Sequence, residues 1–195
     1  MEKAYRVNDI FYSLQGEGHN AGRAAVFVRF SGCNLHCSFC DTDFSHFETL
    51  TAQEIIRRMQ TLIPQGAKKP IVVLTGGEPT LQADAALLDA IHAARFPFIA
   101  MESNGTKEPP ANLDWLTVSP KENVRVRRCN ELKVLYNGTN EPSDGGIQAD
   151  YYYLQPLDTG RAQENKDILE HCVRYIKAHP RWRLSLQTHK LIGIK

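Results

Sequence analysis

Apolar runs alternate with an amphipathic stretch in the first half of the chain. The segment AVFVRF, which ends at Phe30, and the segment 71–75 are rich in β-branched residues, which predicts strands covered on both faces, as in a parallel sheet. Between them, Thr51 and Glu54 form a T-x-x-E capping box, and apolar residues follow at helical spacing. The PQG at 64–66 ends this predicted helix. The pattern therefore predicts a right-handed strand–helix–strand unit.

The second half of the chain contains more strands than helices. Helical periodicity predicts two further helices, at 83–94 and 166–178. Loops rich in Pro, Gly and Asn join several strands without helical spacing. The remaining apolar runs predict strands at 98–103, 115–119, 131–136, 151–155 and 183–187. We therefore expect an α/β fold, a partial (β/α) barrel of about six strands with an abridged coat of about three helices, as a single domain over 1–195.

Composition narrows the choice of compartment and partner. The 195 residues include 23 Lys and Arg against 22 Asp and Glu, so the formal net charge is +1. A net charge this small gives no overall electrostatic attraction to nucleic acid or to a membrane surface. The first residues lack an apolar signal core, and no apolar run approaches the roughly 20 residues of a membrane span. We expect a cytoplasmic protein that binds neither a membrane nor, directly, nucleic acid.

Three of the five cysteines, Cys33, Cys37 and Cys40, lie in one CxxxCxxC loop directly after the first predicted strand. In a reducing cytosol this grouping indicates metal binding or catalysis rather than a disulfide framework. A zinc site would need His36 or His46 as a fourth ligand. A redox dithiol of Cys37 and Cys40 would leave Cys33 unused. An iron–sulfur cluster held by three thiolates would leave one iron open to a reactant.

The companion motifs support the iron–sulfur hypothesis. CxxxCxxC after one strand and TGGEP at 75–79 after the next resemble the signature of the radical S-adenosylmethionine (SAM) superfamily, and the two glycines let backbone carbonyls approach a ligand closely. Further segments, in order and spacing over nearly the whole chain, resemble the family of 7-carboxy-7-deazaguanine synthases; they are FYSLQGEG at 11–18, CDT at 40–42, ESNGT at 102–106, SPK at 119–121, LQP at 154–156 and QTHK at 187–190.

This resemblance implies an enzyme that converts 6-carboxy-tetrahydropterin to 7-carboxy-7-deazaguanine with loss of ammonia, on the route to deazaguanine bases such as queuosine. It implies a 4Fe-4S cluster, S-adenosylmethionine and Mg²⁺ as cofactors, a reductant such as flavodoxin, and a homodimer. Two alternatives stay open from the sequence. One is a radical SAM activating enzyme that generates a glycyl radical on a partner protein. The other is a non-enzymatic metal or electron carrier.

The resemblance also implies roles for individual residues. Cys33, Cys37 and Cys40 would hold the cluster. Hard-cation chemistry nominates Asp41 and Asp43 for Mg²⁺, whereas the resemblance nominates the Thr42 hydroxyl, which we prefer because Mg²⁺ keeps waters and borrows ligands from substrates. The implied cofactor-binding residues are Phe39, Cys40, Asp41, Gly77, Ser119, Pro120, Lys121 and Gln155, and the implied substrate-binding residues are Leu14, Gln15, Gly16, Arg29, Thr75 and Lys195.

Arg29 has a physical argument of its own. It interrupts the apolar strand VFVRF, and a guanidinium group in a buried strand is costly unless an anion meets it. A substrate carboxylate is such an anion. A structural pair with an Asp or Glu of the chain is the alternative.

Overall fold

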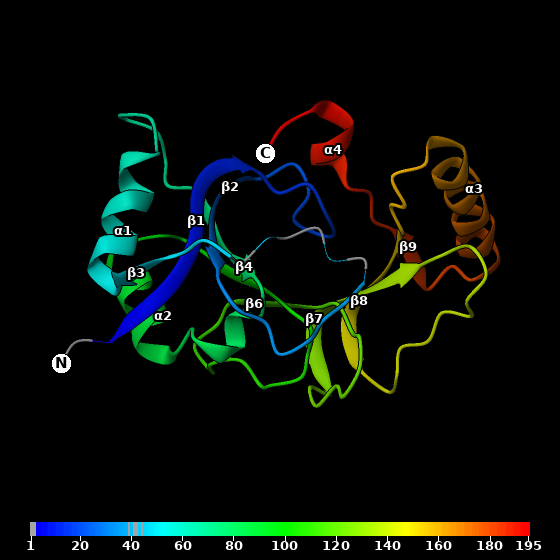
Figure 1. Cartoon of the computed structure of the whole chain (residues 1–195), viewed down its shortest axis with the longest axis horizontal. Helices are drawn as coiled ribbons and strands as arrows, with labels where there is room; N and C mark the ends of the chain where they lie inside the picture. The colour runs from blue at the N-terminus through cyan, green and yellow to red at the C-terminus, as the bar shows by residue number, and fades with distance from the viewer. Residues whose placement is uncertain (1–2, 39, 41–42, 44) are drawn as a thin grey trace.

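One curved sheet organises the part of the chain that the computed structural model describes, residues 3–38, 40, 43 and 45–195 (Figure 1). Within these residues nine strands follow the order β3-β1-β2-β4-β5-β6-β7-β8-β9. From β2 to β9 all neighbours are parallel, and β1 is antiparallel to both β2 and β3. The strands are β1 (Ala4–Leu14), β2 (Ala24–Phe30), β3 (Glu48–Thr51), β4 (Ile71–Gly76), β5 (Ile99–Ser103), β6 (Trp115–Val118), β7 (Arg128–Tyr136), β8 (Gln148–Pro156) and β9 (Trp182–Leu184).

Helices cover one face of this sheet incompletely. In Figure 1, α1 and α2 lie beside the β1–β4 end, and α3 lies beside β8 and β9. The helices are α1 (Ala52–Thr61), α2 (Ala85–Ala93), α3 (Ala162–Ala178) and the short α4 (Thr188–Ile192), with a 3₁₀ turn at Pro79–Leu81. No helix in the described ranges combines the length and the apolar character needed to cross a bilayer.

The capping box predicted at the start of α1 is present. The Thr51 Oγ1 atom accepts a hydrogen bond from the Glu54 amide at 3.3 Å, and the Glu54 carboxylate accepts one from the Thr51 amide at 2.7 Å. α2 begins two residues later than predicted because Asp84 caps it, accepting from the Leu87 amide at 3.0 Å. Local polar signals therefore set the starts of both helices.

The predicted α/β class, a barrel-like sheet with few helices, is confirmed, but the strand count is not. The described residues form nine strands rather than about six. The antiparallel strand β1 was missed because much of it alternates between buried and exposed residues instead of forming a continuous apolar run, and β3 was missed because it has only four residues, of which only Leu50 is buried. The predicted strand 183–187 is also wrong in extent, since β9 ends at Leu184 and α4 begins at Thr188.

The two faces of the sheet differ in chemistry. On the face covered by helices, alternate residues such as Val26, Val28 and Leu74 are fully buried in the main core. The opposite, inner face has a smaller apolar cluster that includes Phe27 and Val73. Two positions further along the same strands, and at the end of β5, this inner face becomes polar, with Arg29, Thr75 and Glu102. The period of two thus places an apolar floor under a polar chamber at the carboxyl ends of the strands.

Candidate active site

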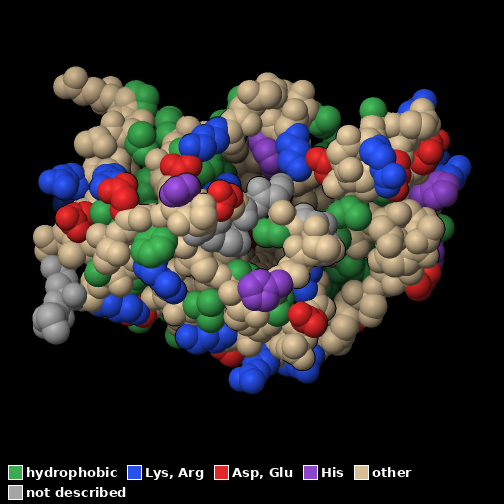
Figure 2. Space-filling model, in the orientation of Figure 1, with side chains coloured by type: hydrophobic (Ala, Val, Ile, Leu, Met, Phe, Trp, Pro, Cys, Tyr) green, Lys and Arg blue, Asp and Glu red, His purple; other side chains and the backbone are tan. Residues whose placement is uncertain are grey.

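Two adjoining cavities occupy the polar chamber at the carboxyl ends of the parallel strands, the usual position of ligands in such folds. The larger has a volume of about 380 Å³ and the smaller about 270 Å³. Figure 2 shows this face of the molecule hollowed near its centre, with side chains of both charges around the hollow. The residues that line both cavities, and so form their shared wall, are Glu17, Thr75, Gly76, Glu102 and Gln187.

The three thiols of the CxxxCxxC loop all line the larger cavity. The Leu35 amide donates to the Cys33 Sγ atom at 3.4 Å, and the Cys40 amide donates to the Cys37 carbonyl at 3.1 Å. Burial raises the pKa of Cys37, and the neighbouring thiols Cys33 and Cys40 raise it further, against the effect of Lys121. Cys33 and Cys40 thus both act on the charge state of Cys37.

Three thiols that line one cavity are a donor set that suits an iron–sulfur cluster. Among the described residues, no three His, Cys, Asp or Glu side chains converge closely enough to hold one metal ion. Ligands of an iron–sulfur cube bind different irons and stand further apart than ligands of a single ion. His36 and His46, the candidate fourth ligands for zinc, do not line the cavity. The assignment of Cys33, Cys37 and Cys40 as cluster ligands stays a prediction, with which their place in one cavity is consistent.

TGGEP lies directly against the start of the cysteine loop. The Gly77 amide donates to the Phe30 carbonyl at 3.0 Å, and the Glu78 amide donates to the Gly32 carbonyl at 2.9 Å. A Cβ atom on Gly77 would lie 1.9 Å from the Gly32 carbonyl oxygen, so no other residue fits at this position without moving the loop. Gly77 also lines the larger cavity, so its predicted cofactor role is accompanied by a packing role.

Glu78, which was not predicted as a site residue, links the cysteine loop to the end of β5. Its fully buried carboxylate accepts hydrogen bonds from the Thr80 amide and hydroxyl at 3.0 and 2.6 Å, the Ser103 hydroxyl at 2.9 Å and the Asn104 amide at 2.7 Å. The Asn104 side-chain amide in turn faces the Cys33 Sγ atom at 3.9 Å. Glu78 thus connects the end of β5 to the first thiol.

The other predicted cofactor residues also gather at the larger cavity, with exceptions. Pro120 is not among the residues that line it, and Asp43 lines neither cavity, although its carboxylate accepts from the Ser45 amide at 2.8 Å. Phe39, Asp41 and Thr42 lie outside the described residues, so the choice between Thr42 and the flanking carboxylates for Mg²⁺ stays a prediction. The predicted residues that do line the larger cavity are Cys33, Cys37, Cys40, Gly77, Ser119, Lys121 and Gln155.

All six predicted substrate residues line the smaller cavity: Leu14, Gln15, Gly16, Arg29, Thr75 and Lys195. The C-terminal segment completes this cavity. The Lys195 Nζ atom lies 2.5 Å from the Asp9 carboxylate, and its backbone oxygen accepts from the Ser13 hydroxyl at 2.6 Å. A Cβ atom on Gly16 would lie 2.3 Å from the His189 ring, so a glycine is required where α4 meets the end of β1.

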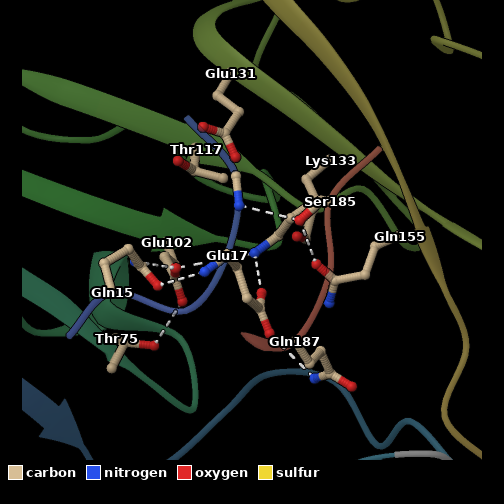
Figure 3. A network of polar contacts seen from close by, with 12 residues as sticks. Gln15, Glu17, Thr75, Glu102, Thr117, Glu131, Lys133, Gln155, Ser185 and Gln187 are labelled. Carbon is tan, nitrogen blue, oxygen red and sulfur yellow. Dashed lines mark hydrogen bonds and ion pairs between the residues drawn. The ribbon is translucent and has the colours of Figure 1, made fainter. Parts of the chain in front are cut away.

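The shared wall is built around an ion pair that sequence analysis missed (Figure 3). The Lys133 ammonium, on β7, pairs with Glu17 and lies 3.9 Å from Glu102. Gln15 and Thr75 donate to the two oxygens of Glu102 at 3.0 and 3.2 Å. Burial alone would raise the pKa of Glu17, but the charge and hydrogen bond of Lys133 outweigh it and lower this pKa to about 2. The Glu17 carboxyl group in this wall is therefore ionised at neutral pH.

The sequence does hold a signal for the cation that pairs with this wall. In the strand segment ELKVLY, Glu131 and Lys133 are charged residues two positions apart in an otherwise apolar run. The period of two places both side chains on one face of the strand. Like Arg29, each is a charged group in a buried strand, which is costly unless a partner of opposite charge or a hydrogen bond meets it. Glu17 and Gln187 carry no comparable local signal, because their partners lie far away in the chain.

Glu131 gives the fold a pH dependence of its own. Burial raises the pKa of its carboxyl group to about 7, and neither Lys133 nor the His19 amide, which donates to it at 2.9 Å, cancels that effect. An acid whose pKa is higher in the folded protein stabilises the fold at low pH, below its unfolded value near 4.5, and this contribution is lost as the pH rises through about 7.

We therefore expect Glu131→Gln to remove roughly 3 kcal/mol of pH-dependent free energy of unfolding between pH 4.5 and 8.5. Urea denaturation of wild type and variant across this range measures the difference. Glu48→Gln is the control: Glu48 is exposed and its pKa is lowered, so it does not titrate in this window. Parallel pH curves for wild type and Glu131→Gln would contradict the assignment.

Comparison with known proteins agrees with this geometry. The model of the radical SAM superfamily matches residues 27–122, which run from β2 through the cysteine loop and TGGEP to Ser119 and Lys121. The solved structure of QueE from Escherichia coli superposes with a TM-score of 0.73 over 95% of each chain, at 25% identity. The fold and the cysteine loop thus define a radical SAM enzyme, a class that uses a 4Fe-4S cluster and S-adenosylmethionine.

Curated relatives resolve the class further. The chain is 44% identical to the 7-carboxy-7-deazaguanine synthase of Bacteroides thetaiotaomicron over 97% of this chain and 98% of that protein. It is 43% identical to the synthase of Nitratidesulfovibrio vulgaris over 97% and 99%, respectively. The chain belongs to the family of 7-carboxy-7-deazaguanine synthases. These matches confirm the predicted family and enzyme class, and they support neither the glycyl-radical activating enzyme nor the electron carrier.

Proposed function

We propose that this enzyme converts 6-carboxy-tetrahydropterin to 7-carboxy-7-deazaguanine with loss of ammonia, in the biosynthesis of 7-deazapurines such as queuosine. One observation carries the proposal beyond family membership. The cavity lined by three thiols and the cavity lined by Arg29 share one wall. The two cavities adjoin at this wall, so a radical formed beside the thiols would lie next to a substrate held beside Arg29.

In the larger cavity, Cys33, Cys37 and Cys40 would hold the 4Fe-4S cluster. When bound, the cluster and S-adenosylmethionine supply the radical that takes hydrogen from the substrate. Lys121 lines the same cavity as the thiols, and its ammonium group would meet the carboxylate of the methionine moiety. The backbone at Gly77 leaves room for the amino group of the same moiety.

In the smaller cavity, Arg29 would bind the substrate carboxylate, because a guanidinium group matches a carboxylate with two parallel hydrogen bonds. Glu17 and Glu102 line the same cavity and, when ionised, act only as acceptors. They suit the N–H groups of the aminopyrimidinone ring of a pterin. Mg²⁺ would join the substrate carboxylate with the Thr42 hydroxyl and waters as its other ligands.

Two partners complete the proposal. A reductant such as flavodoxin would supply the electron, and the exposure of Cys40 supports access to the loop from the surface. A homodimer is supported by the exposed apolar side chains of α4, where Leu191 is 71% and Ile192 56% exposed.

The decisive test is an anaerobic assay of the reconstituted enzyme with 6-carboxy-tetrahydropterin, S-adenosylmethionine, Mg²⁺ and dithionite. We expect the deazaguanine chromophore, with one ammonia released per product. Cleavage of S-adenosylmethionine without conversion of the carboxypterin would show a radical SAM enzyme with another substrate. Conversion that does not respond to added Mg²⁺ would reject the Mg²⁺ site alone.

A further inference from the structure

The Lys133 ammonium group lies beside the wall that the two cavities share, where it contacts Glu17 and Glu102. Its side chain comes from β7, is 5% exposed and lines only the larger cavity of the two. Its partners Glu17 and Glu102, by contrast, line both cavities. The ammonium group therefore reaches the shared wall from the side of the cofactor and contacts the carboxylates that face the substrate.

The hydrogen bonds orient both carboxylates. One oxygen of Glu17 pairs with Lys133, and the other accepts from the Gln187 side chain at 3.0 Å. The Glu102 oxygen nearer to Lys133 also accepts from Gln15 at 3.0 Å. Each acid is thus held by groups on at least two chain segments, and both acids line the two cavities (Figure 3).

Charge makes Lys133 more than a structural contact. Three carboxylates, Glu17, Glu102 and Glu131, interact with its ammonium group, and buried like charges favour protonation of one of their number. The other charged or titratable groups that act on Glu17 or on Lys133 are Lys121 and His189. Without Lys133, one of the acids facing the cavities would take up a proton near neutral pH and become a donor.

We propose that Lys133 is a positioning residue for the reaction proposed above: its ammonium group holds Glu17 and Glu102 as a fixed pair of hydrogen-bond acceptors for the N–H groups of the substrate. The inference rests on the proposed function. It also makes Lys133 a determinant of specificity, because a ring that presents a carbonyl oxygen in place of an amino group would face two carboxylates and be repelled.

The test separates charge from shape. Binding of 6-carboxypterin, the fluorescent oxidised form of the substrate, is measured without turnover, between pH 5.5 and 7.5, on reconstituted enzyme that holds S-adenosylmethionine and no reductant. For wild type we expect a change of less than about twofold in affinity across this range. For Lys133→Met we expect affinity to fall about tenfold or more from pH 7.5 to 5.5, as a carboxylate protonates.

Companion variants keep the test sharp. Lys133→Arg retains the charge and should restore the flat pH profile, and Lys177→Met, near the end of α3, is the matched control. The double variant Lys133→Met with Glu17→Gln removes the unpaired charge, which protects the fold, and should also bind independently of pH.

The experiment distinguishes failure of the role of Lys133 from failure of the proposed function. A flat pH profile in folded Lys133→Met would overturn the role of Lys133 while leaving the proposed function intact. Failure of wild type to bind or convert the carboxypterin would instead reject the proposed function. The 2-oxo analogue of carboxypterin adds a second readout, since Lys133→Met should discriminate less against it than wild type does.

Discussion

Cys33→Ala is expected to abolish turnover and to leave the reconstituted protein without its iron–sulfur absorption. Two remaining thiolates in the loop cannot hold a cluster against loss to solvent, and Cys33 is the thiol that both the Leu35 amide and the Asn104 side chain face. Iron and sulfide content, together with cleavage of S-adenosylmethionine under reduction, measure the outcome.

Cys129→Ala is the matched control for that experiment. Cys129 is buried on β7 and lines neither active-site cavity. Burial raises its pKa to about 12, so it stays a thiol at neutral pH. This variant should keep its iron content and lose only some stability. Full iron content and turnover in Cys33→Ala would show that the cluster has other ligands.

Arg29→Met is expected to weaken binding of 6-carboxypterin roughly 100-fold, about 2.7 kcal/mol, because a guanidinium–carboxylate pair is lost in a partly buried cavity. Pterin without the carboxylate should bind wild type and variant equally weakly. Equilibrium fluorescence titration of both ligands gives the coupling between the guanidinium group and the carboxylate.

Arg23→Met is a suitable comparison, since Arg23 immediately precedes the same strand but lines neither active-site cavity. It should bind carboxypterin as wild type does. Equal losses for both ligands in Arg29→Met would mean that Arg29 is a structural residue, paired with an Asp or Glu of the chain, as in the alternative interpretation of the sequence.

Short-range signals explain what the sequence predicted well. The Thr51–Glu54 capping box lies within four residues, and α1 begins where it predicts. The cysteine loop directly follows β2, and TGGEP lies at the end of β4. Because β2 and β4 are adjacent parallel strands, both motifs lie at the same edge of the sheet. Strand polarity alone therefore brought most of the predicted residues to the two cavities.

Long-range pairing explains what was missed. Glu17 and Lys133 are 116 residues apart, and Gln15 and Glu102 are 87 apart, so no local pattern announces that these polar groups satisfy one another. β3 is a four-residue edge strand that gains its conformation from pairing with β1. α4 is a short helix whose position depends on the contact between Thr188 and Gly16.

The contact between Gly77 and Gly32 limits how the cysteine loop can vary in length. Backbone hydrogen bonds to Phe30 and Gly32 fix the loop up to its first thiol in register with β4. An insertion before Cys33 would break that register, whereas one between Cys33 and Cys37 would leave it intact. Loop grafts between radical SAM enzymes should therefore join after the first cysteine, where the two backbones no longer have to match.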